Sequence, residues 1–245
     1  ATIQRHHQVD AHARTMNGTH SVYASHTGIF KPQSRRDESG NALDPLEGTN
    51  LELGLKSAFL GGRLNTSAAI FQLEQDNFAQ ATGGLTPDGG TAYRAISGVK
   101  TKGYELELSG RLDAHWNLHA GYSHSVSRRQ GEKVSTLAPA NQLSIFATYK
   151  PGGEDGRLTL GGGARWQDET WGDVFNPAAG GMVKHTVADY WVVDAMASYR
   201  FNKQLTGTLN VSNLLDKKYY TIFNAYSTYT WGEPRSVNVS MKYAF

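Results

Sequence analysis

Apolar and polar residues alternate over most of the chain. The clearest case is the final stretch SVNVSMKYAF, residues 236–245, in which almost every second residue is apolar. Because successive side chains of a β-strand point to opposite faces, this stretch predicts a strand with one apolar face and one polar face. The positions on the apolar face are Val237, Val239, Met241, Tyr243 and Phe245.

The same alternation predicts about ten strands in the whole chain. Phe146 is an exception, because it lies on the otherwise polar side of its segment. The regular segments are 51–59, 103–112, 116–125, 143–149, 158–167, 193–201 and 205–213, and two less regular ones are 21–30 and 63–75. Each segment has a length suited to crossing a bilayer at a tilt.

Short and long connections between these strands follow one another in strict alternation. The short ones are 61–63, 112–116, 151–156 and 202–204, and the long ones are 31–49, 79–98, 128–141, 172–189 and 220–235. Hairpins with all long loops at one end are typical of outer-membrane barrels, whereas a soluble sandwich, the alternative fold, usually has short connections at both ends. Aromatic residues near strand ends fit a girdle at the lipid–water boundary: Trp116, Tyr149, Trp166, Tyr199, Phe201, Tyr243 and Phe245. We therefore expect an all-β, antiparallel, up-and-down transmembrane barrel.

The composition excludes several kinds of functional site and partner. The 245 residues carry a formal net charge of +2, which argues against binding to nucleic acid by phosphate neutralisation. The chain has no cysteine, which excludes thiolate metal sites and thiol nucleophiles. Its mean hydropathy of −0.49 is low, as it is in barrels whose alternate residues face a polar lumen.

A family resemblance becomes specific at NVSNLLDKKYY, residues 210–220. This stretch resembles the penultimate-strand motif of TonB-dependent outer-membrane receptors, with Leu215 where phenylalanine is commoner. Five other segments are similar to that family in the same order: 23–33, 43–65, 71–79, 99–110 and 231–245. The likeness is strongest to receptors for ferric siderophores of the hydroxamate and pyoverdine kind, such as the ferric coprogen/rhodotorulic acid and ferripyoverdine receptors.

The resemblance implies a barrel of 22 strands with a plugged lumen, of which residues 19–245 match about ten C-terminal strands. Neither a plug domain nor an energy-coupling segment is recognisable in the sequence. Residues 1–16 do not resemble the strand that the family would have there, and residues 1–18 are expected to be irregular, non-native or frameshifted. A fragment or truncated gene product is the first interpretation, and a complete small ten-stranded barrel is the alternative.

The implied function is TonB-energised uptake of a ferric siderophore across the bacterial outer membrane. The implied partners are the siderophore, the TonB complex through the plug region, the barrel-assembly machinery and outer-membrane lipid. The C-terminal strand that ends at Phe245 is the expected insertion signal. No cofactor is expected, because the iron arrives inside its chelator, and no residue is assigned as catalytic or metal-binding.

Candidate ligand-binding residues lie in the long loops, where aromatic rings offer rigid contact area and arginine offers a fork of donors to chelate oxygens. They are Tyr93, Arg94, Trp171, Phe175, Tyr226, Tyr229 and Trp231. Loop packing is the alternative role for each. Charged residues on the polar face are expected to line the lumen or to pair across strands: Glu105, Glu107, Arg111, Arg165, Asp194, Arg200 and Lys242.

Two other functions compete with uptake. A barrel with protease activity at its rim could use His185, Asp173 and Asp189, although they lie in a glycine-rich loop without paired carboxylates. A passive pore is the third hypothesis. A metal site is not expected, since His115 and His119 are separated by about 13 Å on a strand and the group His6, His7 and His12 has no fixed scaffold.

Overall fold

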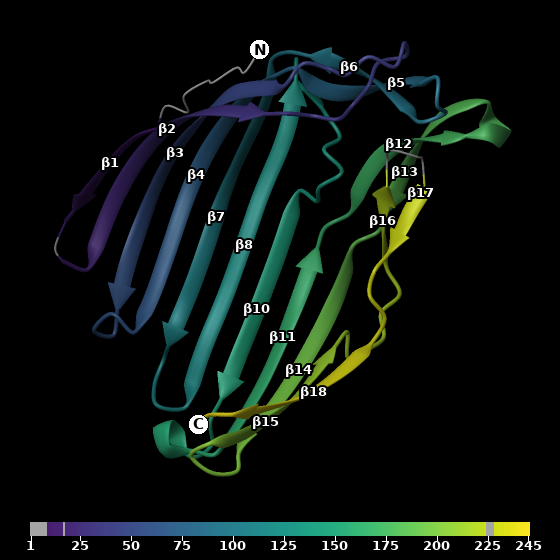
Figure 1. The fold of residues 1–245 in the computed structure, drawn as a ribbon. Coiled ribbons are helices and arrows are strands. Elements are labelled where there is room, and N and C mark those ends of the chain that lie inside the picture. Colours follow the sequence, from purple (N-terminus) through teal and green to yellow (C-terminus); the bar gives the residue numbers. More distant parts are fainter. Residues whose placement is uncertain (1–8, 17, 224–227) are drawn as a thin grey trace.

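One antiparallel sheet of 12 strands runs through the part of the chain that the computed structural model describes, residues 9–16, 18–223 and 228–245 (Figure 1). Each long strand pairs with the next long strand along the chain. The strands are β1 (Val9–Thr15), β2 (His20–Lys31), β3 (Leu46–Phe59), β4 (Leu64–Asp76), β7 (Val99–Arg111), β8 (Trp116–Arg129), the short β9 (Glu132–Lys133), β10 (Asn141–Tyr149), β11 (Leu158–Gln167), β14 (Tyr190–Arg200), β15 (Leu205–Ser212) and β18 (Ser236–Tyr243). Every segment expected to be a strand is part of this sheet, so the predicted up-and-down order is confirmed.

Three hairpins lie outside the sheet and form two-stranded sheets of their own. They are β5 (Phe78–Leu85) with β6 (Thr91–Ile96), β12 (Thr170–Asn176) with β13 (Gly181–Val187), and β16 (Tyr220–Phe223) with β17 (Thr228–Trp231). The only regular helical pieces among the described residues are two 3₁₀ turns, Gly153–Asp155 and Pro177–Ala179. No helix in that part of the chain is long and apolar enough to cross a membrane.

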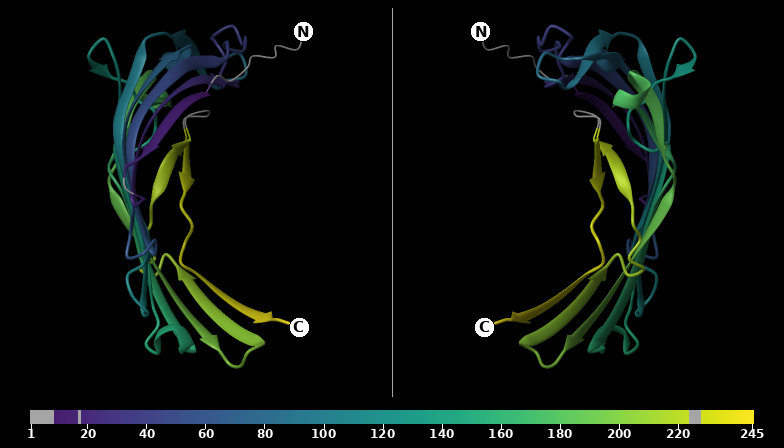
Figure 2. Two further views of the ribbon diagram at one scale, coloured as in Figure 1. Left: turned by 90° about the vertical axis from the view of Figure 1, so that its left-hand side faces the viewer. Right: turned by 90° about the vertical axis from the view of Figure 1, so that its right-hand side faces the viewer.

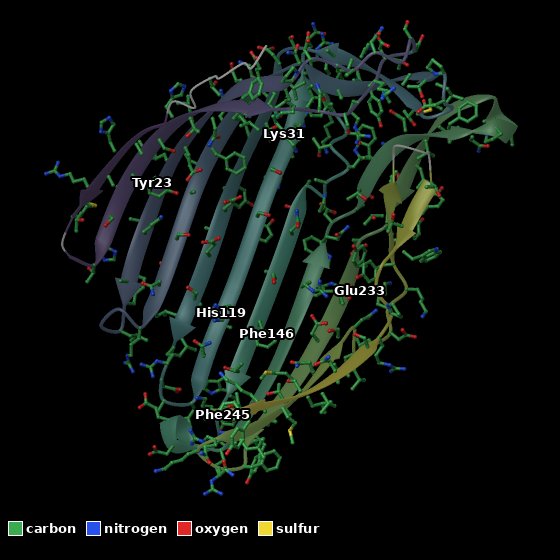
Figure 3. All side chains as sticks on the ribbon, viewed as in Figure 1. Tyr23, Lys31, His119, Phe146, Glu233 and Phe245 are labelled. Carbon is green, nitrogen blue, oxygen red and sulfur yellow. The ribbon has the colours of Figure 1, made fainter. Side chains whose placement is uncertain are left out.

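The sheet bends into a gutter with a C-shaped profile (Figure 2). The three hairpins lie at one end of it, which we call the loop end, and the short connections lie at the other, the turn end. Figure 1 looks into the concave face, on which the labelled Tyr23, His119 and Phe146 of Figure 3 lie. Long loops at one end and short turns at the other agree with the spacing of the predicted strands.

The two faces of the gutter differ in polarity. The convex face carries large apolar side chains in the open, among them Leu53 and Leu106, each 49% exposed, and Val239, 71% exposed. The concave face carries a polar row in which Glu105, Ser123, Gln142 and Gln167 are successive partners across β7, β8, β10 and β11. Such large exposed apolar area is costly in water but favourable against hydrocarbon. The convex face is therefore the lipid-facing side.

Aromatic rings lie over glycines on the concave face. A Cβ atom added to Gly163 would lie 2.6 Å from Cδ2 of Phe146, and one added to Gly161 would lie 3.2 Å from Cζ of the same ring. Gly54 faces the ring of Tyr23 in the same way. Phe146 therefore breaks the alternation because its ring covers two glycines of the neighbouring strand, which have no side chains of their own; at Gly161 it shares this space with Met196.

Gly103 provides a test of this close packing. An added Cβ would lie 2.3 Å from the backbone oxygen of His124 and 2.5 Å from Cζ of Phe71. Because the backbone of β8 has to move, Gly103→Ala is expected to lower the free energy of unfolding by about 1–3 kcal/mol. Urea unfolding of the protein in lipid vesicles measures the loss. Gly121→Ala is the control, since nothing lies within 4 Å of that position, and an equal loss in both variants would contradict the explanation.

Part of the N-terminal segment differs from the expectation of an irregular structure. Within residues 1–18, Val9–Thr15 forms strand β1 and pairs with β2 from Val9 opposite Thr27 to Thr15 opposite Ser21. The sequence of this strand does alternate, with Val9 and two alanines on one side and polar residues on the other, but so small an apolar side is a weak signal. Residues 1–8 lie outside the described part of the chain.

Candidate ligand-binding surface at the loop end

A cavity of about 660 Å³ lies between four connections at the loop end. Its walls come from the segment that follows β2, the β5–β6 hairpin, the stretch after β9 and the start of β12. Residues of several chemical types line it, including Arg35, Phe78, Tyr93, Lys133, Trp171 and Asp173. The fold thus brings together Tyr93 and Trp171, two of the predicted ligand-binding residues, although they lie 78 positions apart in the sequence.

Tyr93 is a buried support for Arg35. Its side chain is only 4% exposed, and Nη1 of Arg35 donates a hydrogen bond of 3.1 Å to its hydroxyl oxygen. The guanidinium carbon of Arg35 lies 4.7 Å from the ring centroid, in cation–π contact. Burial raises the pKa of Tyr93, and the charge of Arg35 opposes that rise. The neutral phenol therefore fixes a cation at the cavity wall, a role that the sequence did not reveal because 58 residues separate the pair.

Arg94 points away from the cavity. It is exposed, and its Nε and Nη2 atoms donate to Oε1 of Gln80 at 3.3 and 3.1 Å. Gln80 is the partner of Arg94 in the β5–β6 ladder. Neighbouring residues of a strand face opposite sides, so Tyr93 and Arg94 cannot both line one wall.

Trp171 is held in place from two sides. Its backbone oxygen accepts a hydrogen bond of 2.5 Å from the hydroxyl of Ser135, and Nζ of Lys184 lies 4.6 Å from its ring centroid. The half-buried ring at the cavity wall therefore has a cation beside it. Phe175, farther along β12, is half-buried opposite Met182 in the hairpin and does not line the cavity.

A second aromatic group connects the β12–β13 and β16–β17 hairpins. The ring of His185 lies 5.0 Å from Tyr229 and 6.0 Å from Tyr220, whose hydroxyl is 3.2 Å from Nε2 of the histidine. Trp231 contacts Tyr220 edge-on with ring centroids 5.4 Å apart and is 68% exposed. Tyr229 and Trp231 therefore share one surface, apart from the cavity, while Tyr226 lies outside the described residues.

The residues considered for protease activity do not converge. Asp173 is opposite Lys184 in the β12–β13 ladder, and His185 belongs to the aromatic group. Asp189 accepts a hydrogen bond of 3.2 Å from Nε1 of Trp166. In the described part of the chain, no group of three or more histidines and carboxylates is arranged to hold a metal ion.

Several predicted lumen charges pair with nearby groups. On the concave face, Nε of Arg165 lies 3.4 Å from Oδ2 of Asp194, beside a depression of about 420 Å³ lined by Glu105 and Glu107. Arg111 and Arg200 instead bind the turn at 150–157, through Oε1 of Glu154 at 2.7 Å and the backbone oxygen of Asp155 at 2.9 Å. The predicted cross-strand pairing is thus found at Arg165 and Asp194.

The motif at residues 210–220 forms a compact turn around Asn213. Asn213 is only 2% exposed, and its Nδ2 donates to the backbone oxygens of Lys217 and Glu233 at 2.9 and 3.0 Å. Its Oδ1 accepts a hydrogen bond from Lys217 N at 2.8 Å. Asp216 accepts a bond from the backbone N–H of Arg235, which with the Lys218 ammonium lowers the pKa of its carboxyl. The motif therefore connects the end of β15 to the start of β18.

Comparison with known proteins gives a family. The family described as "TonB dependent receptor-like, beta-barrel" matches residues 13–214. The ferripyoverdine receptor of Pseudomonas aeruginosa is 43% identical over 237 residues, covering 94% of this chain and 29% of the receptor. The ferrioxamine B receptor of Salmonella typhimurium is 34% identical over 236 residues, covering 91% and 32%. This chain thus spans about a third of the length of these curated relatives.

Solved structures agree with this relationship. The crystal structure of the outer-membrane ferripyoverdine receptor of P. aeruginosa bound to ferripyoverdine matches with a TM-score of 0.80 and 41% identity, over 97% of this chain and 32% of that one. The alcaligin outer-membrane receptor of Bordetella pertussis matches with a TM-score of 0.61 and 40% identity, over 84% and 34%. The predicted resemblance, barrel fold and location are confirmed. The chain belongs to the TonB-dependent receptor-like β-barrel family, whose members are receptors of the outer membrane and not enzymes.

Proposed function

We infer that this chain supplies barrel wall and ligand-contacting loops to a receptor that takes up a ferric siderophore of the hydroxamate or pyoverdine kind. The observation that carries the proposal is the 43% identity to the ferripyoverdine receptor over nearly the whole chain, together with the identity to the ferrioxamine B receptor. The cavity at the loop end adds support, because its wall offers the ring of Trp171 and the guanidinium of Arg35, held by Tyr93, to a bulky anionic chelate.

The proposed contacts follow from the geometry. Trp171 presents a ring to the chelate, and Arg35, held by Tyr93, presents donors to its oxygens. Tyr229 and Trp231 form a second contact surface on the neighbouring hairpin. Arg94, Phe175 and Tyr226 stay as predicted contacts, and the iron binds to its chelator rather than to the protein.

Energy coupling and assembly complete the proposal. Uptake is driven by TonB through a plug region, and the barrel-assembly machinery recognises the strand from Val237 to Phe245. In that strand Val237, Val239, Met241 and Tyr243 are 52–71% exposed on the convex face, and the rings of Tyr243 and Phe245 are in edge contact at 5.3 Å. An apolar face with an aromatic end fits a strand that inserts into lipid and anchors at its boundary.

Iron-limited growth tests the function. A strain that lacks the complete gene is given ferripyoverdine, ferrioxamine B or a ferric catecholate as its iron source, with and without the gene restored. Growth on one hydroxamate-containing chelate is expected to depend on the gene. Unchanged uptake of all three chelates in the deletion strain would overturn the uptake proposal.

A variant at the cavity tests the contacts. Trp171→Ala is expected to weaken binding of the chelate identified by growth by about 10- to 30-fold, because a large ring at a contact surface is lost. Fluorescence titration of the detergent-solubilised protein measures the affinity. Trp116→Ala is the control, since Trp116 stacks near Tyr149 at the turn end, with ring centroids 4.7 Å apart. Equal affinities of the Trp171→Ala variant and the original protein would exclude Trp171 as a contact.

A further inference from the structure

Three cations gather on the lipid-facing side of the sheet at the loop end. Along β7 and β8 the paired residues of the convex face are Leu106–Tyr122, Tyr104–His124, Lys102–Val126 and Lys100–Arg128. Each two-residue step advances about 7 Å along the strand. The order is therefore apolar, aromatic and cationic from the bilayer interior toward the loops, so the cations lie just beyond the aromatic girdle.

The cations form the wall of a groove. A groove of about 600 Å³ is lined by Lys100, Lys102, Tyr104, His124 and Arg128, together with uncharged residues of β7, β8 and the connections at their loop ends. The ring of His124 stacks on Tyr104 with centroids 5.2 Å apart, and its Nδ1 lies 2.8 Å from Oδ1 of Asn141. The base of the groove is thus a fixed aromatic surface beneath exposed charges.

The charges are only partly neutralised. Nζ of Lys100 lies 2.6 Å from Oε1 of Glu74, and Nη1 of Arg128 donates to the backbone oxygen of Gly131 at 2.7 Å, which leaves its charge uncompensated. Lys102 has no ion-pair partner in the part of the chain that the structure describes. Asp76, the next residue on this face of β4, accepts a hydrogen bond of 3.0 Å from the backbone N–H of Gly98 at the edge of the groove. Among the described residues, three exposed cations and no carboxylate therefore line the groove itself, and the carboxylates of β4 lie beside it.

An apolar groove continues from the same place. It also measures about 600 Å³, is lined by Leu51, Leu53 and Ile70, and shares Lys102 and Gly103 with the cationic groove. The two grooves together present cations at the membrane boundary and an apolar channel directed along the lipid-facing wall. Elsewhere at the loop end of this face, β11, β14, β15 and β18 carry Trp166, Trp191, Val211 and Val237.

We propose that these joined grooves bind a phosphorylated, acylated lipid of the outer leaflet. Its phosphate contacts Lys100, Lys102 and Arg128, and an acyl chain lies along Leu51, Leu53 and Ile70. Basic clusters at a membrane boundary attract anionic headgroups, and the loop end of such barrels faces outward, which places the phosphate in the outer leaflet. The site lies on the opposite face of the sheet from the lumen and does not depend on the proposed uptake function.

The proposal is tested by measuring how tightly three defined probes bind to the detergent-solubilised protein, expressed from the complete gene. Native mass spectrometry compares diphosphorylated lipid A, the same lipid without its phosphates, and inorganic phosphate. The diphosphorylated lipid is expected to bind most tightly. Equal binding of the dephosphorylated lipid would overturn recognition of the phosphate, and equal binding of inorganic phosphate would overturn recognition of a lipid.

A charge-matched pair of variants locates the site. The triple variant Lys100→Gln, Lys102→Gln, Arg128→Gln is expected to lose about 100-fold in affinity for diphosphorylated lipid A, at a few-fold per cation. The control triple, Lys150→Gln, Arg157→Gln, Lys203→Gln, removes the same residue types at the turn end and is expected to stay within about twofold. Exchange to Lys100→Arg, Lys102→Arg, Arg128→Lys keeps the charge and is expected to keep the affinity. Equal affinities of the first triple and the control would overturn the site.

Discussion

Val239→Arg is expected to lower the free energy of unfolding of the membrane-inserted protein by about 2–4 kcal/mol. Val239 lies near the middle of β18, opposite Leu209 of β15, and is 71% exposed on the convex face. A guanidinium at that depth has to leave water for hydrocarbon or distort the bilayer, and its partner on β15, Leu209, offers it no opposite charge. Urea unfolding in lipid vesicles, followed by gel mobility of the folded form, measures the loss.

The neighbouring residue supplies the control for this experiment. Asn238 points to the concave face, opposite Asn210, so Asn238→Arg places the same charge on the polar side of the same strand. We expect a change of less than about 0.5 kcal/mol there, as for an exposed polar position. Equal losses for the two arginine variants would show that the convex face of β18 does not contact hydrocarbon.

Asn213→Ala is expected to cost about 3 kcal/mol of stability. The residue has a φ of 49°, in the left-handed region that asparagine tolerates better than alanine. Its loss leaves the backbone oxygens of Lys217 and Glu233 and the N–H of Lys217 without the partners that they have in a buried site. An unsatisfied buried group costs about 1–3 kcal/mol, and water entering the turn recovers part of it.

Two further variants separate the causes of that effect. Glycine tolerates the positive φ at this position, but Asn213→Gly loses the same side-chain hydrogen bonds as Asn213→Ala. It is therefore expected to be only about 1 kcal/mol less destabilising than Asn213→Ala. Asn65→Ala, at an exposed position with one long bond of 3.4 Å to Gly62, is expected to be nearly neutral. Unfolding midpoints in urea compare the three, and a neutral Asn213→Ala would refute the structural role of the turn.

The sequence predicted the wall of the barrel better than its loops. Alternation identifies a strand when one face is apolar, as at Val237, Val239 and Met241, because period two leaves only one way to orient the strand. The stretch VDAHART of β1 also has period two, but its apolar side carries only Val9 and two alanines, so the pattern is weak and the strand was not predicted. The pattern identified Phe146 as an exception, but it could not explain this aromatic ring on the polar face, because the ring packs over glycines of another strand.

The candidate site could be predicted only in part. Aromatic and basic residue types in long loops identified Tyr93 and Trp171, which do line one cavity. The pattern could not identify Arg35, because its importance depends on a contact with Tyr93 across 58 positions. Nor could it separate Tyr93 from Arg94, whose opposite directions follow from a hairpin inside a stretch that composition describes only as a loop.

The three hairpins at the loop end form separate two-stranded sheets, and none of their strands is part of the ladder of the large sheet. Residues can therefore be exchanged, inserted or deleted at their tips without shifting the register of any strand that crosses the bilayer. The barrel wall and the proposed ligand-contacting surface can therefore change at different rates in evolution. A receptor of this construction can acquire a new chelate by changing a few loop residues while its insertion into the membrane stays the same.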